Sequence, residues 1–396
     1  MIRIDQLDFK GKRALIRVDF NVPLNENLQI TDDTRIMAAV PTIQHVLDTG
    51  GSVVLMSHLG RPKNGPEERF SLRHLIAKLE EIFGREVHFL SDCIGVEAEE
   101  KSSALMPGEI LLLENLRFHK AETAGDEAFA ASLAKLGDIY VNDAFGTAHR
   151  AHASTAVIAA HFTEKKCFGY VMATEIENVG RVLQSDKRPV TAIIGGAKVS
   201  SKITVIENLL PKIDHLIVGG GMAYTFCRAL GAQTGRSMVE EEHLETARSI
   251  VQKAEELGVQ IHLPEDSLNA LEFANDSETE VTKMHSIGKD WMGLDVGPKT
   301  RVLNRSVIMS SAVILWNGPV GVFEMSSFSE GTIELGQAIV EATGNGAFSL
   351  VGGGDSVAAA KQFGFAEQVS YVSTGGGAML EYLEGKDLPG IQAVLN

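Results

Sequence analysis

The stretch "LIRVDFNVPLNENLQITDDTRI", residues 15–36, starts as an apolar strand and ends at the first turn of an expected helix. The strand closes on Asp19 and Asn21, Pro23 follows two residues later, and Arg35 falls near the helix N-terminus. The helix dipole disfavours a cation at that end by roughly a few tenths of a kcal/mol, and a bound anion would reverse the effect. The stretch therefore predicts that Asp19 either accepts a hydrogen bond from a ligand hydroxyl or orients an arginine.

The same order of apolar strand, polar end and amphipathic helix recurs along the chain, and it is typical of a doubly wound parallel α/β sheet. At 396 residues the chain exceeds the roughly 250–300 residues that one hydrophobic core usually serves, so two domains are expected. We predict domains at 1–173 and 189–379, with a connecting helix over 174–188 that ends before a proline. The tail 380–396 is too short to be a domain and must dock on a folded part.

Four expected strands in the first half, ALIRVDF, SVVLMSH, EILLLENLRF and DIYVNDAF, lead into polar or cationic side chains. These side chains are Asp19, Asn21, His58, Arg61, Arg117, His149, Arg150 and His152. Ligands of open α/β sheets bind beyond the carboxyl ends of the strands. Because guanidinium groups bind phosphate and carboxylate bidentately, the repetition predicts a site for a small, multiply anionic molecule.

Each of these residues alone also has a structural explanation. An arginine near a helix start is often a solvated surface residue, and His58 by itself is more often a hydrogen-bonded structural histidine. Asp19 and Asn21 are also ordinary turn residues ahead of a proline. The repetition over four strand ends favours the functional interpretation.

In the second half the expected strands end in glycine: IIGG, LIVGGG, LWNGP, SLVGGG and STGGG. Glycine lets backbone N–H groups approach a phosphate, and a helix N-terminus favours an anion. Lys198 and Lys202 lie one helical turn apart after the first of these strands. Asp355 would repel a phosphate unless Mg²⁺ lay between them; the alternative is that Asp355 or Ser356 caps a helix. Glu324 is a candidate for binding ribose hydroxyls.

The absence of several known motifs narrows the class of ligand that this chain can be expected to bind. The sequence contains neither GxxxxGK[ST] nor GxGxxG, and neither HExxH nor GxSxG. Glycine-rich strand ends with lysine and aspartate therefore favour a mononucleotide such as ADP or ATP over a dinucleotide.

Composition excludes several other classes of protein. The net charge of −16 and pI near 5.2 argue against a protein that binds nucleic acid or an anionic membrane. The three cysteines form no CxxC pair, so we expect reduced, buried thiols of a cytoplasmic protein and no disulfide framework or zinc site. No apolar run approaches the ~18 residues of a membrane-spanning helix, and the N-terminus does not resemble a secretory signal.

The sequence resembles the phosphoglycerate kinase family along essentially its whole length. The resemblance rests on RVDFNVP, SHLGRP, ENLRF, YVNDAFGTAHRAHAST, GGAKVSSKI, VGGGMAYTF, WMGLDVGP, LWNGPVGVFE, GGGDS and STGGGA, in that order. It implies two Rossmann-like domains joined by a hinge helix. The first domain, with the tail, would bind 3-phosphoglycerate or 1,3-bisphosphoglycerate, and the second would bind MgADP or MgATP. It also implies a cytoplasmic monomer.

By the same resemblance, the acid-substrate residues are Asp19, Asn21, Arg35, His58, Arg61, Arg117 and Arg150. The nucleotide residues are Gly195, Lys198, Lys202, Gly219, Gly293, Asn317, Glu324, Gly353, Gly354, Asp355 and Ser356, with Asp355 on Mg²⁺. The residues expected to act in catalysis are Arg35, Lys198, Gly354 and Gly377. The expected reaction is direct in-line phosphoryl transfer after domain closure. Two alternatives remain at this stage: a nicotinamide-dependent dehydrogenase and a non-catalytic sensor of phosphorylated metabolites.

Overall fold

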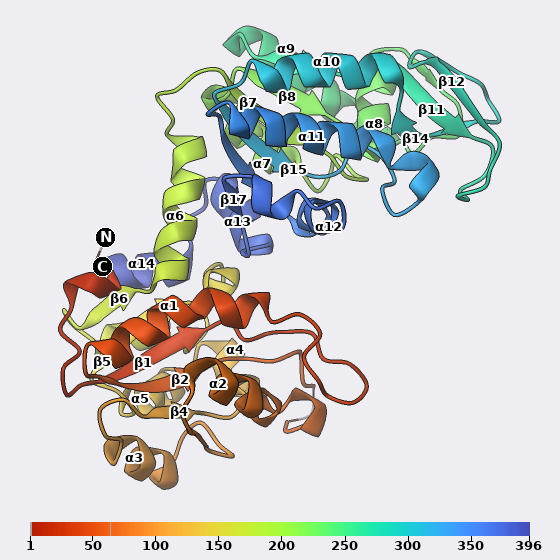
Figure 1. The fold of residues 1–396 in the computed structure, drawn as a ribbon. Coiled ribbons are helices and arrows are strands. Elements are labelled where there is room, and N and C mark those ends of the chain that lie inside the picture. Colours follow the sequence, from red (N-terminus) through yellow and green to blue (C-terminus); the bar gives the residue numbers. More distant parts are fainter. Residues whose placement is uncertain (1, 64) are drawn as a thin grey trace. The chain divides into compact units, whose positions relative to one another are not determined.

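The computed structural model describes residues 2–63 and 65–396. The chain divides into two compact units (Figure 1). Unit 1 comprises the chain up to Ile176 together with Asp387–Asn396, and unit 2 comprises Glu177–Lys386. Each unit is built on a six-stranded sheet in which all neighbouring strands are parallel. The prediction of an α/β protein with two parallel sheets is confirmed.

Unit 1 has the strand order β3-β4-β2-β1-β5-β6. Its strands are β1 (Arg13–Val18), β2 (Ser52–Met56), β3 (Val87–Phe89), β4 (Ile110–Leu112), β5 (Ile139–Asp143) and β6 (Lys166–Phe168). Its helices are α1 (Thr34–Asp48), α2 (Ile76–Phe83), α3 (Val96–Ser103), α4 (Lys120–Ala124), α5 (Glu127–Ala134) and α14 (Pro389–Leu395), and α6 (Tyr170–Leu183) begins in this unit. Short 3₁₀ helices lie at Ile4–Gln6, Glu68–Phe70, Leu72–Leu75, Leu116–Phe118, Phe145–Thr147 and Val157–His161.

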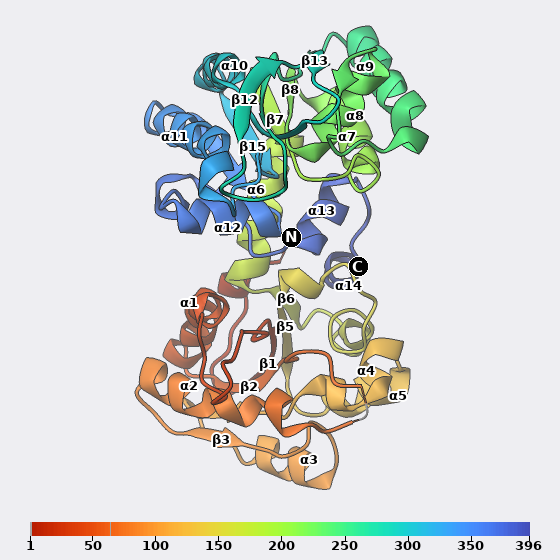
Figure 2. The same cartoon turned by 90° about the vertical axis from the view of Figure 1, so that its right-hand side faces the viewer.

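Helices cover both faces of this sheet: α1 and α2 lie on one side, and α4 and α5 lie on the other (Figure 2). Every residue of β2 and β5 is consequently buried. This explains why these strands read as continuous apolar runs rather than as alternating patterns. The core on one face includes Ile16, Leu55, Leu112 and Val141, one from each of the four central strands.

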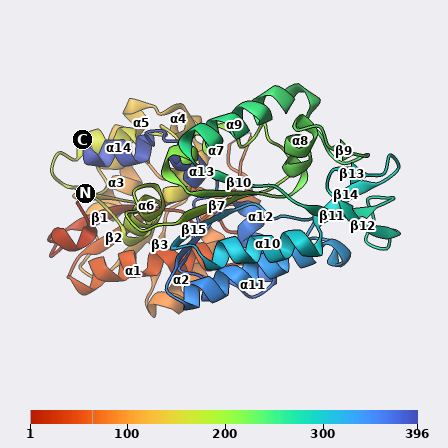
Figure 3. The same ribbon diagram turned by 90° about the horizontal axis from the view of Figure 1, so that it is seen from above.

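Unit 2 has the strand order β10-β8-β7-β15-β16-β17. Its main strands are β7 (Val190–Ile194), β8 (His215–Val218), β10 (Gln260–His262), β15 (Val313–Asn317), β16 (Phe348–Val351) and β17 (Tyr371–Val372). Its helices are α7 (Ile203–Leu209), α8 (Gly221–Ala229), α9 (Leu244–Leu257), α10 (Pro298–Met309), α11 (Glu330–Gly344), α12 (Gly354–Gln362) and α13 (Gly377–Leu383). Its 3₁₀ helices are Leu210–Lys212, Glu241–His243, Ser326–Phe328 and Ala366–Gln368. Helices α7, α8 and α9 lie on one side of the sheet, and α10 and α11 lie on the other (Figure 3).

Unit 2 also contains two small sheets that the sequence analysis did not predict. One is an antiparallel sheet of β12 (Thr279–Lys283), β11 (Asp266–Ala270) and β14 (Met292–Val296). The other pairs β13 (Ser286–Ile287) with β9 (Gln233–Thr234). Strand β12 is polar, with exposed and half-buried residues alternating, so it has no apolar run that would identify it.

The C-terminal segment packs on unit 1. Asn142 Nδ2 donates to the Gly390 carbonyl at 3.0 Å, the Gly390 N–H donates to the Ala148 carbonyl at 2.8 Å, and Lys166 Nζ donates to the Ala393 carbonyl at 2.9 Å. A Cβ at Gly390 would lie 3.0 Å from Ala148 Cα, so a glycine allows this close approach. The contacts explain how a segment too short to fold alone is held.

The described residues include no helix that is both long enough and apolar enough to cross a bilayer.

Candidate active site

In unit 1 the predicted anion-binding residues follow four adjacent strands, β4, β2, β1 and β5. Because these strands are parallel, their carboxyl ends lie along one edge of the sheet. Asp19 and Asn21 follow β1, His58 and Arg61 follow β2, Arg117 follows β4, and Arg150 follows β5. The edge strands β3 and β6 carry none of the predicted residues.

Asp19 orients an arginine, which is one of the two roles predicted for it. Arg35, in the first turn of α1, places Nη1 3.0 Å from Asp19 Oδ2 and donates to the Asn21 carbonyl at 3.2 Å. The Asn21 side-chain oxygen accepts from the Gly60 N–H at 2.8 Å. The ends of β1 and β2 are therefore joined, and the Arg35 guanidinium is held over them.

Arg117 is held in the same region and is poorly solvated. Its Nη1 donates to the Gly60 carbonyl at 2.9 Å, while within the described residues its buried Nε has no hydrogen-bond partner. Burial and the nearby Arg17 lower the pKa of Arg117 to about 10. A cation with a buried free donor next to other cations is a site that an anion would stabilise.

His58 is buried at the end of β2. The residue is only 4% exposed, and Arg17 Nη2 lies 3.3 Å from its Nδ1. Burial, followed by the charges of Arg17 and Arg117, lowers the pKa of His58 well below its ordinary value. His58 is therefore a neutral imidazole that offers a hydrogen bond and not a charge.

Arg61 and Arg150 are exposed, but their charges are felt at the site. The Arg61 charge is among those that lower the pKa of Arg117, after burial and Arg17. Burial, then Arg117 and Arg17 and then Arg150, lowers the pKa of His152 to about 4. The strand ends of unit 1 thus form one positively charged region.

Sequence reasoning missed Arg17, which lies within β1 and is fully buried. Its Nε donates to Ser154 Oγ at 2.8 Å, and Ser154 Oγ donates to Glu122 Oε1 at 2.6 Å. The Ser154 N–H donates to the other Glu122 oxygen at 3.0 Å. A buried cation is thereby balanced by a buried carboxylate through a hydroxyl. The signal available in the sequence is an arginine inside an otherwise apolar strand.

In unit 2 a pocket of about 370 Å³ lies at the carboxyl ends of β7, β15 and β16. It is lined by Gly195, Gly196, Ala197, Lys198, Ser201, Lys202, Asn317, Gly318, Gly353, Gly354, Asp355, Ser356 and Leu380. Eight of the predicted nucleotide residues lie together there, namely Gly195, Lys198, Lys202, Asn317, Gly353, Gly354, Asp355 and Ser356.

Polar side chains join the strand ends below this pocket. Lys202 Nζ donates to Asn317 Oδ1 at 2.6 Å, and Asn317 Nδ2 donates to the Gly352 carbonyl at 2.7 Å. The Gly318 N–H donates to the buried Ser356 hydroxyl. Burial lowers the pKa of Lys202, and the negative charge of Asp355 partly opposes this decrease.

Helix α12 has Gly353 as its N-cap residue and has no side-chain cap. The alternative explanation that Asp355 or Ser356 caps this helix therefore does not describe the structure. Asp355 lies in the first turn with its carboxylate exposed beside the pocket.

Glycine is required at position 195, where the end of β7 meets the segment after β15. A Cβ at Gly195 would lie 2.1 Å from the Pro319 carbonyl oxygen, far inside contact distance. The N–H of Gly195 donates to the Asn317 carbonyl at 2.9 Å, which brings the end of β7 against the end of β15. Backbone therefore packs against backbone at this strand end, where a side chain would not fit.

Glu240 is a second residue that sequence reasoning missed. Its two carboxylate oxygens accept from the Ser200 N–H at 3.0 Å and from the Ser200 hydroxyl at 2.6 Å. Burial opposes ionisation, but the hydrogen bonds from Ser200 outweigh it and lower the pKa of Glu240. Glu240 thus holds the turn between Lys198 and Lys202.

Four predicted residues do not line this pocket: Gly219, Gly293, Glu324 and Gly377. A Cβ at Gly219 would lie 2.4 Å from Val320 Cγ1. Gly293 lies in β14, where a Cβ would lie 2.1 Å from the Tyr224 hydroxyl. For both residues the structure supplies a packing reason for glycine. Glu324 is exposed, and Gly377 begins α13.

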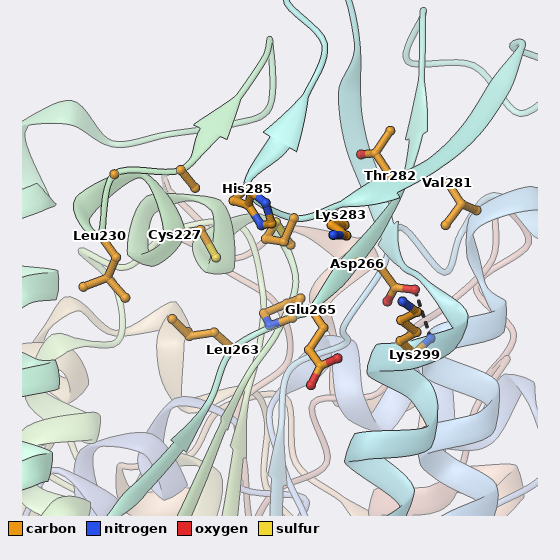
Figure 4. A pocket seen from close by; sticks show the side chains of 14 residues that line it. Cys227, Leu230, Leu263, Glu265, Asp266, Val281, Thr282, Lys283, His285 and Lys299 are labelled. Atoms are coloured by element: carbon orange, nitrogen blue, oxygen red, sulfur yellow. Dashed lines mark hydrogen bonds between the residues drawn. The ribbon is translucent and has the colours of Figure 1, made fainter.

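Unit 2 has a larger pocket, about 700 Å³, which is lined by none of the predicted residues within the described chain (Figure 4). Asp266 at its wall accepts from the Lys299 and Thr300 N–H groups at 2.9 Å each, so its carboxylate holds the start of α10. The smaller pocket, which collects eight predicted residues, is therefore the candidate nucleotide site.

One unit has arginine-rich strand ends. The other has glycine-rich strand ends, a lysine pair and an exposed carboxylate. These features suit a phosphotransferase of small metabolites. A family model described as phosphoglycerate kinase matches residues 4–386. The chain belongs to the phosphoglycerate kinase family, so it is an enzyme of glycolysis, a phosphotransferase with a carboxyl group as acceptor.

Curated relatives and solved structures match the chain over its whole length. A phosphoglycerate kinase of Porphyromonas gingivalis is 53% identical over 415 residues, covering 99% of this chain and 99% of the relative. One of Chloroherpeton thalassium is 49% identical over 393 residues, covering 99% of this chain and 98% of the relative. The structure of phosphoglycerate kinase from Coxiella burnetii superposes with a TM-score of 0.93 at 42% identity, covering 100% of this chain and 98% of that one.

Proposed function

We propose that this chain catalyses reversible phosphoryl transfer between 1,3-bisphosphoglycerate and MgADP, giving 3-phosphoglycerate and MgATP. Unit 1 binds the acid substrate and unit 2 binds the nucleotide. The observation that carries the proposal is the guanidinium cluster at four adjacent strand ends, because a phosphate and a carboxylate on one small molecule need several bidentate cations.

In unit 1, Arg61, Arg117 and Arg150 bind the phosphate and carboxylate of the acid substrate. The neutral His58 and the Asn21 side chain supply hydrogen bonds, and Asp19 holds Arg35 so that its guanidinium meets the transferring group. The buried Arg17 adds positive charge behind the site. The buried free Nε of Arg117 supports this assignment.

In unit 2, the glycine-lined pocket binds the phosphates of ADP or ATP, with Lys198 and Lys202 as counter-charges. Gly219, Gly293 and Glu324 are assigned to the base and ribose by the family resemblance. Asp355 would hold Mg²⁺, since an exposed carboxylate in the first turn of α12 offers the oxygen ligand that this cation prefers. The cation supplies neutralisation of charge on the phosphate oxygens.

Transfer is direct and in line, with no phosphorylated side chain. Because the transition state spreads charge over the equatorial oxygens, positioning and electrostatic stabilisation supply most of the catalysis. Arg35 and Lys198 stabilise that charge, and the backbone N–H groups of Gly354 and Gly377 contribute. Direct transfer needs both substrates in one space that excludes water, so we propose hinge-bending closure. The predicted connecting segment is 174–188, and its helical part, α6, ends at Leu183.

The proposed domains are 1–173 with the tail 380–396 for the acid substrate and 189–379 for the nucleotide; the compact units divide this tail, with residues up to Lys386 in unit 2 and Asp387–Asn396 in unit 1. The family resemblance implies a cytoplasmic monomer, and the acidic net charge argues against binding to nucleic acid or to an anionic membrane.

A coupled assay with 3-phosphoglycerate and MgATP tests the proposal. Turnover that requires both substrates and Mg²⁺ is expected. Reduction of a nicotinamide cofactor without ATP would indicate the dehydrogenase alternative. Tight binding of 3-phosphoglycerate without turnover would indicate a sensor, and either result would overturn the proposed function.

A further inference from the structure

A group of metal-binding side chains lies in unit 1 outside the proposed acid-substrate residues. Asp92 and Cys93 lie in the loop between β3 and α3, and His119 directly precedes α4. One carboxylate oxygen, the Cys93 Sγ and one imidazole nitrogen lie within 4.8 Å of one another. His119 Nε2 and Asp92 Oδ1 are 2.6 Å apart.

We propose that Asp92, Cys93 and His119 form a binding site for a divalent cation of the zinc class. Thiolate, imidazole and carboxylate are the three protein ligands that Zn²⁺ prefers. Zinc–ligand distances of about 2.0–2.3 Å place the ligand atoms of a tetrahedral site roughly 3.3–3.8 Å apart. The three ligand atoms here lie within 4.8 Å of one another, and the 2.6 Å contact between Asp92 Oδ1 and His119 Nε2 must open by about 0.7 Å to reach that spacing. Side-chain rotation can supply that movement, and a water molecule completes the four ligands.

The surroundings favour a metal ligand set over a simple surface ion pair. Cys93 is 1% exposed, and the His119 ring lies 5.2 Å from the ring of the buried Phe129. Asp92 lies on the solvent-facing side of the three residues, with a side chain that is 56% exposed. Its Oδ1 also accepts a hydrogen bond from the Cys93 N–H at 2.6 Å. The ligands are thus held by apolar packing on one side and reached by solvent on the other.

Charge balance agrees with one divalent cation. A carboxylate, a thiolate and a neutral imidazole carry two negative charges together, which a divalent cation neutralises. The thiol proton passes to solvent as the metal–sulfur bond forms.

The test uses Co²⁺ as a spectroscopic substitute for Zn²⁺ on the full-length protein. One equivalent of Co²⁺ should produce a thiolate-to-metal charge-transfer absorption, and Zn²⁺ should abolish it by competition. Cys93→Ser should remove the absorption and weaken Zn²⁺ binding by more than about 100-fold, because a direct ligand should matter at least as much as an outer-shell partner. His119→Gln keeps the thiol, and it should weaken both the Co²⁺ charge-transfer absorption and the binding of Zn²⁺.

Two control variants keep the result specific. Cys227→Ser removes a buried thiol of unit 2, and His243→Gln changes a second possible cation cluster, Glu240, Glu242 and His243, which has no thiol. Neither should change the Co²⁺ absorption. The proposal is overturned if wild-type protein gives no charge-transfer band, if Zn²⁺ binds more weakly than about 1 mM, or if Cys93→Ser binds Zn²⁺ as the wild type does. Circular dichroism and thermal melting of each variant establish that it is folded.

Discussion

The two units use the same parallel-sheet architecture but build their strand ends from different chemistry. In unit 1 the ends carry side chains, and cations are held in place by carboxylates and carbonyl oxygens, as Arg35 is by Asp19 and Asn21. In unit 2 the ends carry glycines, and the pocket wall is backbone. The first site is therefore sensitive to loss of charge and the second to gain of volume.

The largest expected effect is loss of charge at Arg35. Arg35→Ala should lower kcat by about 10³-fold, as expected for an arginine that stabilises a transferring phosphoryl group, while leaving nucleotide affinity nearly unchanged. Steady-state kinetics and nucleotide titration measure both. Arg305→Ala is the matched control, because Arg305 pairs with Glu341 on the surface of unit 2. Wild-type turnover in the Arg35 variant would remove this residue from the mechanism.

The next largest effect is expected from a larger side chain at position 195. Gly195→Ala would place a methyl group 2.1 Å from the Pro319 carbonyl oxygen, so the free energy of unfolding should fall by about 3 kcal/mol and nucleotide binding should weaken. Chemical denaturation and nucleotide titration check the two effects. Gly344→Ala is the control, since nothing lies within 4 Å of a Cβ at Gly344, the last residue of α11. Equal stabilities for the two variants would show that the strand end can relax.

The cationic strand ends should also make unit 1 sensitive to pH. Burial and neighbouring arginines lower the pKa of His152 from 6.5 to about 4 in the folded state. Between these values the unfolded chain binds a proton that the folded chain does not. Stability should therefore fall as the pH drops from 6.5 to 4, by about 3 kcal/mol from this residue.

Comparing wild type with His152→Gln by urea denaturation at several pH values isolates that contribution. The difference in unfolding free energy between the two proteins should change with pH only in this window. A constant difference from pH 7 to pH 4 would contradict the assignment.

The smallest effect is expected at Glu240, which positions the lysine-bearing turn of unit 2 without lining the pocket. Glu240→Ala removes both acceptors for Ser200, so KM for the nucleotide should rise about tenfold, or roughly 1.4 kcal/mol. KM for 3-phosphoglycerate should stay unchanged. The neighbouring variant Glu242→Ala is the control, and a parallel rise in both KM values would indicate a general structural defect.

The sequence could predict the parts of both sites that follow apolar strands, because adjacent parallel strands bring their ends together. Asp19, Lys198 and Asp355 were located in this way. Glu240 could not be, since it reaches Ser200 across 40 residues of chain through a loop without a pattern. Arg17 was missed because one charged residue in an apolar run does not reveal whether it points to solvent or to a buried partner such as Ser154.

The packing of α14 against Asn142 and Ala148 has a consequence for the order of assembly during translation. Unit 2 is inserted in the chain between Ile176 and Asp387. A ribosome therefore synthesises all of unit 2 before it synthesises Asp387–Asn396, the last segment of unit 1. Until Gly390 leaves the exit tunnel, it cannot contact Ala148, and the buried side-chain amide of Asn142 lacks the Gly390 carbonyl as an acceptor. Unit 1 can therefore begin to fold before unit 2 is synthesised, but it can complete its fold only afterwards.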